Sequence, residues 1–133
     1  MNIDNLLRQH KEIYAILNSI KEMICRNDFQ DNYTEFARSI SHLAGKLQIH
    51  LNTEDKFLYP KLLENKALEY KTRKYIDEIS ILLVTFNEFK NKFNTKSKLV
   101  NYEYSVIKDE TLAIIRKIEE RMEREEGDIY ELC

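Results

Sequence analysis

A histidine and a glutamate lie one helical turn apart near the middle of the chain, at His50 and Glu54. Residues four apart share one face of an α-helix, so the imidazole and the carboxylate would point the same way. Leu43, Leu47 and Phe57 continue that face at spacings of three and four. The pattern therefore predicts two ionisable groups on the buried face of a helix, where a carboxylate needs a cation or a hydrogen-bonding partner.

Two further ionisable groups have comparable positions elsewhere in the chain. His10 interrupts an apolar stripe near the N-terminus, and Glu125 follows Arg121 by four residues near the C-terminus. Two carboxylates that face each other in a core need a positive centre or a shared proton between them. Imidazole and carboxylate together suit iron, manganese or zinc. We predict a metal site of His10, His50, Glu54 and Glu125; the alternative is a metal-free core in which Arg121 neutralises the carboxylates.

Four segments must position these groups. Their apolar residues recur at spacings of three and four, which is typical of amphipathic helices. The predicted helices span residues 3–24, 32–60, 68–93 and 102–130, with a polar loop at 94–101. Pro60 should kink or end the second helix because it cannot donate a backbone hydrogen bond. Long helices with short connections predict an all-α fold, an antiparallel up-down-up-down four-helix bundle, in one domain of residues 1–133.

The two halves of the chain echo each other at an offset of about 70 residues. Under this pairing, His10 and His50 of the first half correspond to Ile79 and Arg121 of the second half. The predicted site therefore has imidazoles on one side only. His42, the remaining histidine, lies beside the apolar stripe and is expected to be exposed.

Composition limits the alternatives. Only two of the 133 residues are glycine and one is proline, which leaves little turn material for a β-sheet protein. The net charge of -2 offers no basic surface for nucleic acid, and no segment is long and apolar enough for a membrane span. Cys25 and Cys133 are too few and too distant for a disulfide or zinc framework. We therefore expect a cytoplasmic protein.

These features together resemble the hemerythrin-like, or HHE cation-binding, domain family over essentially the whole chain. The residues that carry the resemblance are His10, His50-x-x-x-Glu54 with Leu58-Tyr59-Pro60, and Glu125-Glu126-Gly127-Asp128-Ile129-Tyr130. The resemblance implies two irons, histidines from all four helices and two bridging carboxylates. By position, His10 and His50 match the histidines of one iron. Glu54 and Glu125 match the bridging carboxylates, with Glu126 as an alternative in register.

The chain departs from that family pattern on the side of the other iron. The resemblance places histidines there, where this chain has Tyr75, Ile79 and Arg121. Iron, as one or two ions, is the expected cofactor, and dioxygen, nitric oxide or peroxide is the expected ligand, for sensing, handling or iron storage. The alternative is a metal-free bundle that serves as an interaction or scaffold module with an unidentified protein partner. Catalysis ranks third, because the sequence shows no arrangement of a nucleophile with a base.

Overall fold

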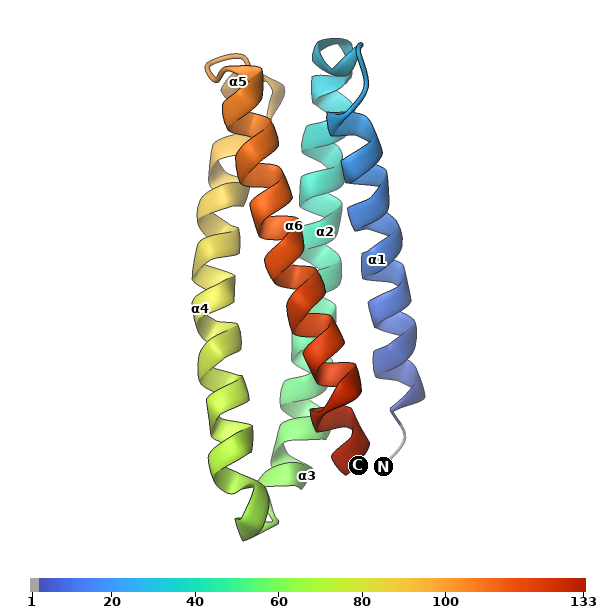
Figure 1. Ribbon diagram of the computed structural model, residues 1–133, viewed down its shortest axis with the longest axis vertical. Helices are drawn as coiled ribbons and strands as arrows, with labels where there is room; N and C mark the ends of the chain where they lie inside the picture. Colours follow the sequence, from blue (N-terminus) through green and yellow to red (C-terminus); the bar gives the residue numbers. More distant parts are fainter. Residues whose placement is uncertain (1–2) are drawn as a thin grey trace.

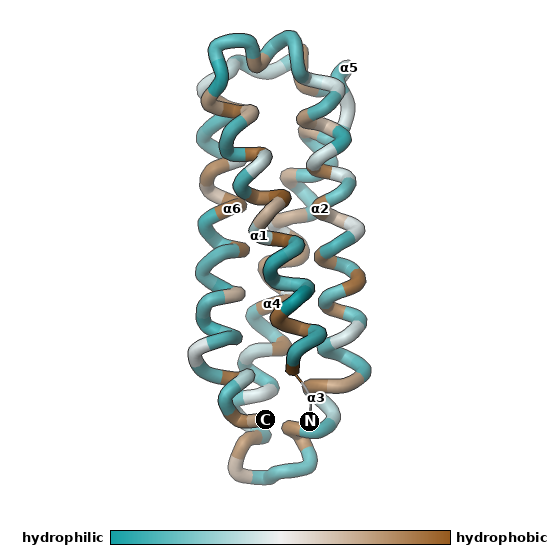
Figure 2. The backbone as a smooth tube through the Cα atoms, turned by 90° about the vertical axis from the view of Figure 1, so that its right-hand side faces the viewer, coloured by the Kyte–Doolittle hydropathy of each residue, from teal (hydrophilic) through white to brown (hydrophobic). Residues whose placement is uncertain are grey.

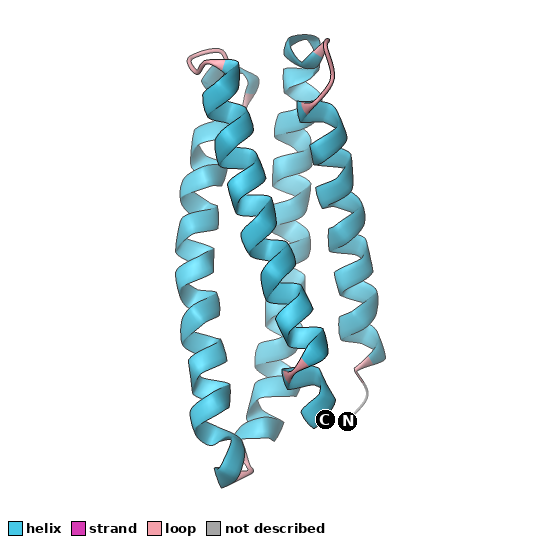
Figure 3. Cartoon of the chain, in the orientation of Figure 1, coloured by secondary structure: helices cyan, strands magenta, loops and turns pink. Residues whose placement is uncertain are grey.

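Long helices make up most of the computed structural model, which describes residues 3–133. The helices longer than 20 residues are α1 (Asp4–Ile24), α2 (Tyr33–Thr53), α4 (Glu69–Phe93) and α6 (Tyr104–Gly127). They lie side by side along the longest axis, and the start of α1 lies at the same end of the molecule as the C-terminus (Figure 1). Residues 3–133 contain no strand, and loops are confined to short connections (Figure 3). The predicted all-α class is confirmed.

Each long helix buries one face. The buried residues of α1 follow the predicted spacing of three and four, with one addition, and are Leu6, Gln9, His10, Ile13, Leu17, Ile20 and Ile24. Apolar and polar residues consequently alternate along the backbone of each helix (Figure 2). Burial of the apolar face supplies most of the stability of such helices, since short helices are marginal in water. No helix within residues 3–133 combines the length and the apolar character that crossing a membrane requires.

The apolar core is divided into two clusters with a polar layer between them. The smaller cluster lies toward the chain termini and consists of Leu6, Leu58, Tyr59, Leu62, Tyr75, Ile129 and Tyr130. The larger cluster fills the rest of the interior and includes Ile13. In α1, His10 comes between Leu6 of one cluster and Ile13 of the other. Arg121 and Glu125 of α6 likewise precede Ile129, which lies just after that helix and belongs to the smaller cluster.

The helix that carries His50 changes its geometry directly after α2. A π-helical turn, Glu54–Leu58, is closed by a hydrogen bond from the Tyr59 backbone N–H to the Glu54 carbonyl oxygen. The short helix α3 (Tyr59–Leu63) follows, with Pro60 in its first turn, where a missing N–H is tolerated. The irregularity thus precedes Pro60, and it begins at a predicted site residue. Single π-helical turns are frequent at functional sites.

The π-helical turn changes which residues face the core. It adds a residue to one turn, so the buried face shifts by one position beyond it. Leu58 is fully buried, whereas the Phe57 side chain is 57% exposed. The prediction that Phe57 continues the buried face is therefore wrong, because it assumed regular α-helical geometry through this turn.

Alanine substitutions at these two neighbours test the shift of face. Leu58→Ala should lower the free energy of unfolding by about 2–5 kcal/mol, because it leaves a cavity in the core. Phe57→Ala should change it by less than about 0.5 kcal/mol, as expected for an exposed position. Urea unfolding followed by circular dichroism measures both. A larger loss for Phe57→Ala than for Leu58→Ala would show that the helix is regular.

The segment predicted as a polar loop contains a short helix, α5 (Lys96–Leu99). The Thr95 side chain caps it by accepting a hydrogen bond from the Lys98 backbone N–H at 3.3 Å. Leu99 is fully buried against the larger core cluster. The loop prediction is thus partly wrong, because two adjacent apolar residues, Leu99 and Val100, among polar ones give no periodic signal.

Candidate metal centre

Three of the predicted ligand residues meet in the polar layer. The Nε2 atom of His10, on α1, lies 3.0 Å from Nε2 of His50, on α2, and 2.9 Å from Oε1 of Glu125, on α6. These ligand atoms all lie within 4.8 Å of one another, and the three side chains are buried. Two imidazoles and a carboxylate are a donor set that suits iron and other first-row transition metals. The geometry therefore fits one metal ion.

Glu54, the fourth predicted ligand, borders this group. Its side chain is fully buried, and its Oε2 atom lies 3.5 Å from Nε2 of His50. The same oxygen accepts a hydrogen bond of 2.8 Å from the Tyr130 hydroxyl. The structure thus brings all four predicted residues to one layer, with Tyr130 between Glu54 and the other three. His42 is exposed, as expected.

The two histidines are oriented by hydrogen bonds at their outer nitrogens. Nδ1 of His10 lies 2.8 Å from Oε2 of Glu126, and Nδ1 of His50 lies 2.8 Å from Oε1 of Gln9. Both partners are acceptors, so each Nδ1 carries the hydrogen and each Nε2 points into the layer. Gln9 is itself held by a hydrogen bond to Thr53 Oγ1 at 3.0 Å. Such partners fix the tautomer and ring orientation of metal-binding histidines.

Sequence reasoning did not identify these outer partners. Gln9 lies directly before His10 and is buried, while the Glu126 side chain remains 38% exposed. Periodicity assigns residues to a face but does not say which off-stripe side chain turns back toward a histidine. The available signal was chemical: a metal-binding imidazole needs an acceptor for its second nitrogen.

The buried groups differ in how readily they hold a proton. Burial alone would lower the pKa of His50, but its hydrogen bonds to Glu125 and Glu54 raise that pKa to about 9. Burial opposes the charge on Glu125, yet hydrogen bonds from His10 and His50 and the charge of Arg121 hold the pKa of its carboxyl below the usual range. Burial and the nearby Glu125 raise the pKa of Glu54. Without metal, His50 therefore holds a proton that a metal ion would displace.

The raised pKa of His50 predicts how the stability of the metal-free protein depends on pH. A group whose pKa is higher in the folded state stabilises fully below its unfolded pKa and loses that contribution as pH rises through the folded value. The free energy of unfolding should therefore fall by about 3 kcal/mol between pH values near 6.5 and 9. Urea unfolding in the presence of a chelator measures this. His50→Gln is the control, and an equally steep fall in that variant would contradict the assignment.

Arg121 fills the other side of the polar layer. Its Nε donates to Oε2 of Glu125 at 2.9 Å, and its Nη1 donates to the Tyr75 carbonyl oxygen at 2.9 Å. Nη2 donates to the Tyr59 hydroxyl at 3.1 Å, and the guanidinium carbon lies 4.7 Å from the centre of the Tyr75 ring. A buried cation thus stands at the position that the half-chain repeat pairs with His50. A second metal ion does not fit there, because it would meet this fixed positive charge.

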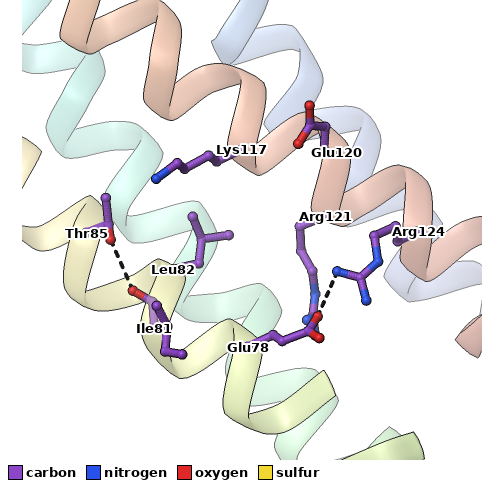
Figure 4. A pocket seen from close by; sticks show the side chains of 8 residues that line it. All are labelled: Glu78, Ile81, Leu82, Thr85, Lys117, Glu120, Arg121 and Arg124. Carbon is purple, nitrogen blue, oxygen red and sulfur yellow. Dashed lines mark hydrogen bonds and ion pairs between the residues drawn. The ribbon is translucent and has the colours of Figure 1, made fainter. Parts of the chain in front are cut away.

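Three hollows adjoin the layer, and one of them, of about 470 Å³, is bordered by His10 and Glu126. A pocket of about 330 Å³ between α4 and α6 is bordered by Arg121 and by an ion pair between Glu78 and Arg124 at 2.7 Å (Figure 4). It reaches none of the three grouped ligand residues. A narrower cleft of about 20 Å³ between α2, α4 and α6 is lined mainly by apolar side chains, with Arg121 among its other lining residues. This cleft reaches His50 and Glu125 and has room for little more than one water-sized molecule.

Comparisons with known proteins give one positive result. A family model described as the hemerythrin HHE cation binding domain matches residues 1–133. Comparisons with curated proteins and with solved structures give no match.

Proposed function

Because the chain belongs to the hemerythrin HHE cation-binding domain family, we propose that it binds one non-haem iron ion. His10, His50 and Glu125 would hold the ion. Glu54 would lie beside the ion or serve as a fourth ligand. The observation that carries the proposal is the convergence of two Nε2 atoms and a carboxylate oxygen within 4.8 Å of one another in a buried layer. Manganese or zinc would suit the same donors, and iron is the metal that the family resemblance implies.

Too few hydrogen atoms are available to join the inner imidazole nitrogens to Glu125, which supports a cation in this layer. With each Nδ1 already carrying a hydrogen, the inner nitrogens of His10 and His50 both present lone pairs toward Glu125. Lone pairs that face each other at hydrogen-bonding distance need a proton or a metal between them. In the metal-free protein the raised pKa of His50 supplies one such proton. A metal ion would satisfy all three groups at once.

The remaining parts of the proposal concern architecture and location. We propose an antiparallel up-down-up-down four-helix bundle in a single domain of residues 1–133, supported by short connections between long amphipathic helices. We also propose a cytoplasmic location. The free thiols of Cys25 and Cys133 fit a reducing compartment.

The role that suits a single ion is the sensing or handling of a small oxidant, or iron storage. Bound iron would supply open positions for dioxygen, nitric oxide or peroxide. The apolar cleft that reaches His50 and Glu125 is suited to a small neutral molecule of this kind. Oxygen carriage by reduction to peroxide takes one electron from each of two irons. Arg121 stands where a second ion would be needed, so we do not propose oxygen transport.

Metal analysis tests the proposal directly. Protein purified from iron-supplied cells should contain about one iron per chain, and not two, as expected for one set of imidazole and carboxylate donors. Inductively coupled plasma mass spectrometry measures iron, manganese and zinc in the same sample. Less than about a tenth of an equivalent of any transition metal would refute metal binding. Two irons per chain would refute the single-ion arrangement.

The ion pair of Arg121 with Glu125 supports a second candidate function. The two are buried and lie 2.9 Å apart, so the guanidinium already neutralises one carboxylate. A metal-free bundle that serves as an interaction or scaffold module would keep this pair. That candidate predicts no bound metal under any loading condition. The metal analysis therefore separates the two functions.

A further inference from the structure

The Tyr130 hydroxyl lies in the middle of the candidate ligand atoms. Its Oη atom is 3.1 Å from Nε2 of His10, 3.3 Å from Nε2 of His50 and 3.2 Å from Oε1 of Glu125. It also donates a hydrogen bond of 2.8 Å to Oε2 of Glu54. Only 1% of the Tyr130 surface is exposed. The oxygen is therefore as close to every candidate ligand as these ligands are to one another.

The local fold explains how Tyr130 reaches this position. Helix α6 ends at Gly127, and the 3-10 turn Ile129–Leu132 follows it almost directly. Ile129 and Tyr130 are buried in the smaller core cluster. The Tyr130 ring stacks on the His10 ring, with centroids 5.3 Å apart and an interplanar angle of 28°. Packing of this turn thus holds the hydroxyl beside the imidazoles.

Two other buried tyrosines near the polar layer are arranged differently. The Tyr59 hydroxyl pairs with Arg121 at 3.1 Å and with Glu54 at 3.4 Å, and the structure gives it no hydrogen bond to either histidine. The Tyr75 hydroxyl donates to Asp128 at 2.8 Å, away from the layer. Tyr130 is therefore the phenol that the fold places among the imidazoles.

We propose that Tyr130 Oη is a further ligand to the same metal ion, and that it makes the site selective for ferric iron. The inference depends on the proposed function, because it requires that an ion binds between His10, His50 and Glu125. A phenolate is a hard anionic oxygen donor, which suits a trivalent ion better than a divalent one. With Glu125 and Tyr130 both anionic, their two negative charges would neutralise two of the three positive charges of the ferric ion.

The coordination step balances without any transfer of electrons. The O–H bond of Tyr130 breaks, and its proton passes to the Glu54 carboxylate that already accepts its hydrogen bond at 2.8 Å. Oη would then be free, as a phenolate, to bind the ion. Burial, followed by the charges of Glu125 and Glu54, raises the pKa of Tyr130 in the metal-free protein, so the phenol keeps its proton there. A bound cation reverses this preference, as metal ions do for the groups that coordinate them.

Visible spectroscopy of the ferric protein tests the inference. Purified protein is loaded with ferric citrate, freed of unbound iron by desalting, and examined for iron content and absorption. The wild type should show a broad visible charge-transfer band, because ferric phenolates absorb in this way. Tyr130→Phe should bind iron yet lose the band. Tyr59→Phe, a matched removal of a neighbouring buried hydroxyl, should keep it.

The possible results separate this inference from the proposed function. A wild type that binds iron without a visible band, or a Tyr130→Phe variant that keeps the band, refutes the ligand role of Tyr130 alone. Loss of the band in Tyr59→Phe but not in Tyr130→Phe refutes it as well. A wild type that binds no iron refutes both. Should Tyr130→Phe fail to fold, Tyr130→His retains a donor atom at this position and must likewise lose the band.

Discussion

Replacing Arg121 with alanine should lower the free energy of unfolding of the metal-free protein by about 3–5 kcal/mol. The guanidinium is buried and satisfies Glu125, the Tyr75 carbonyl and the Tyr59 hydroxyl at 2.9–3.1 Å. Its removal breaks a buried ion pair, leaving protonated His50 as the charged partner of Glu125, and it also removes the donor to the buried Tyr75 carbonyl; breaking such a pair is costly. Urea unfolding in the presence of a chelator, followed by far-ultraviolet circular dichroism, measures the loss.

Arg124→Ala provides the matched control for this prediction. Arg124 pairs with Glu78 at 2.7 Å, but its side chain is half exposed, so the loss should stay below about 1 kcal/mol. A double variant of Arg121→Ala with Glu125→Gln should recover part of the stability, because it removes the carboxylate of the broken ion pair. Equal losses for Arg121→Ala and Arg124→Ala would contradict the role we assign to Arg121.

Arg121→His distinguishes the two proposed functions. This substitution places an imidazole at the position that the half-chain repeat pairs with His50. If the polar layer binds iron, the iron content should rise from about one toward two ions per chain, because the buried cation is replaced by a neutral donor. If the chain is a metal-free scaffold, the variant should bind no more metal than the wild type does.

Replacing His50 with alanine should reduce bound iron to less than about a tenth of an ion per chain. Loss of an outer hydrogen-bond partner of a metal ligand typically costs 10–100-fold in metal affinity, and loss of the ligand itself should cost at least as much. His50 contributes one of the three grouped ligand atoms. Metal analysis after loading with iron and desalting measures the effect.

His42→Ala is the control for nonspecific binding, because His42 lies on the same helix but is exposed. It should keep the iron content of the wild type. Circular dichroism should show that both variants retain their helices. If His50→Ala binds as much iron as His42→Ala does, the metal lies elsewhere on the chain.

Helix positions were predictable because they follow from local periodicity. The spacing of apolar residues located α1, α4 and α6 to within about three residues, whereas α2 ends at Thr53 and the predicted second helix continues as the π-helical turn and α3. The same spacing predicted that His10, His50 and Glu125 face inward, and all three are buried. The family resemblance is confirmed by the match over residues 1–133. That these residues bind a metal stays a prediction.

The failures of sequence reasoning share one cause: they depend on geometry that local periodicity does not encode. Phe57 was assigned to the core because the spacing was extended through a turn that is π-helical. Gln9 and Glu126 were missed as histidine partners because neither lies on the apolar stripe. Periodicity also gave no sign that the turn after Gly127 brings the Tyr130 hydroxyl among the candidate ligands.

The order of apolar and polar residues was sufficient to establish four amphipathic helices and the residue types that each turns inward, since those depend only on the 3.6-residue repeat. Tertiary packing decided the rest: which nitrogen of each imidazole points inward, that Arg121 bonds to the Tyr75 carbonyl and the Tyr59 hydroxyl, and that a phenol joins the cluster. Those outcomes depend on contacts between side chains 40 or more residues apart, such as His10 with His50. Such contacts exist only after the helices have packed together.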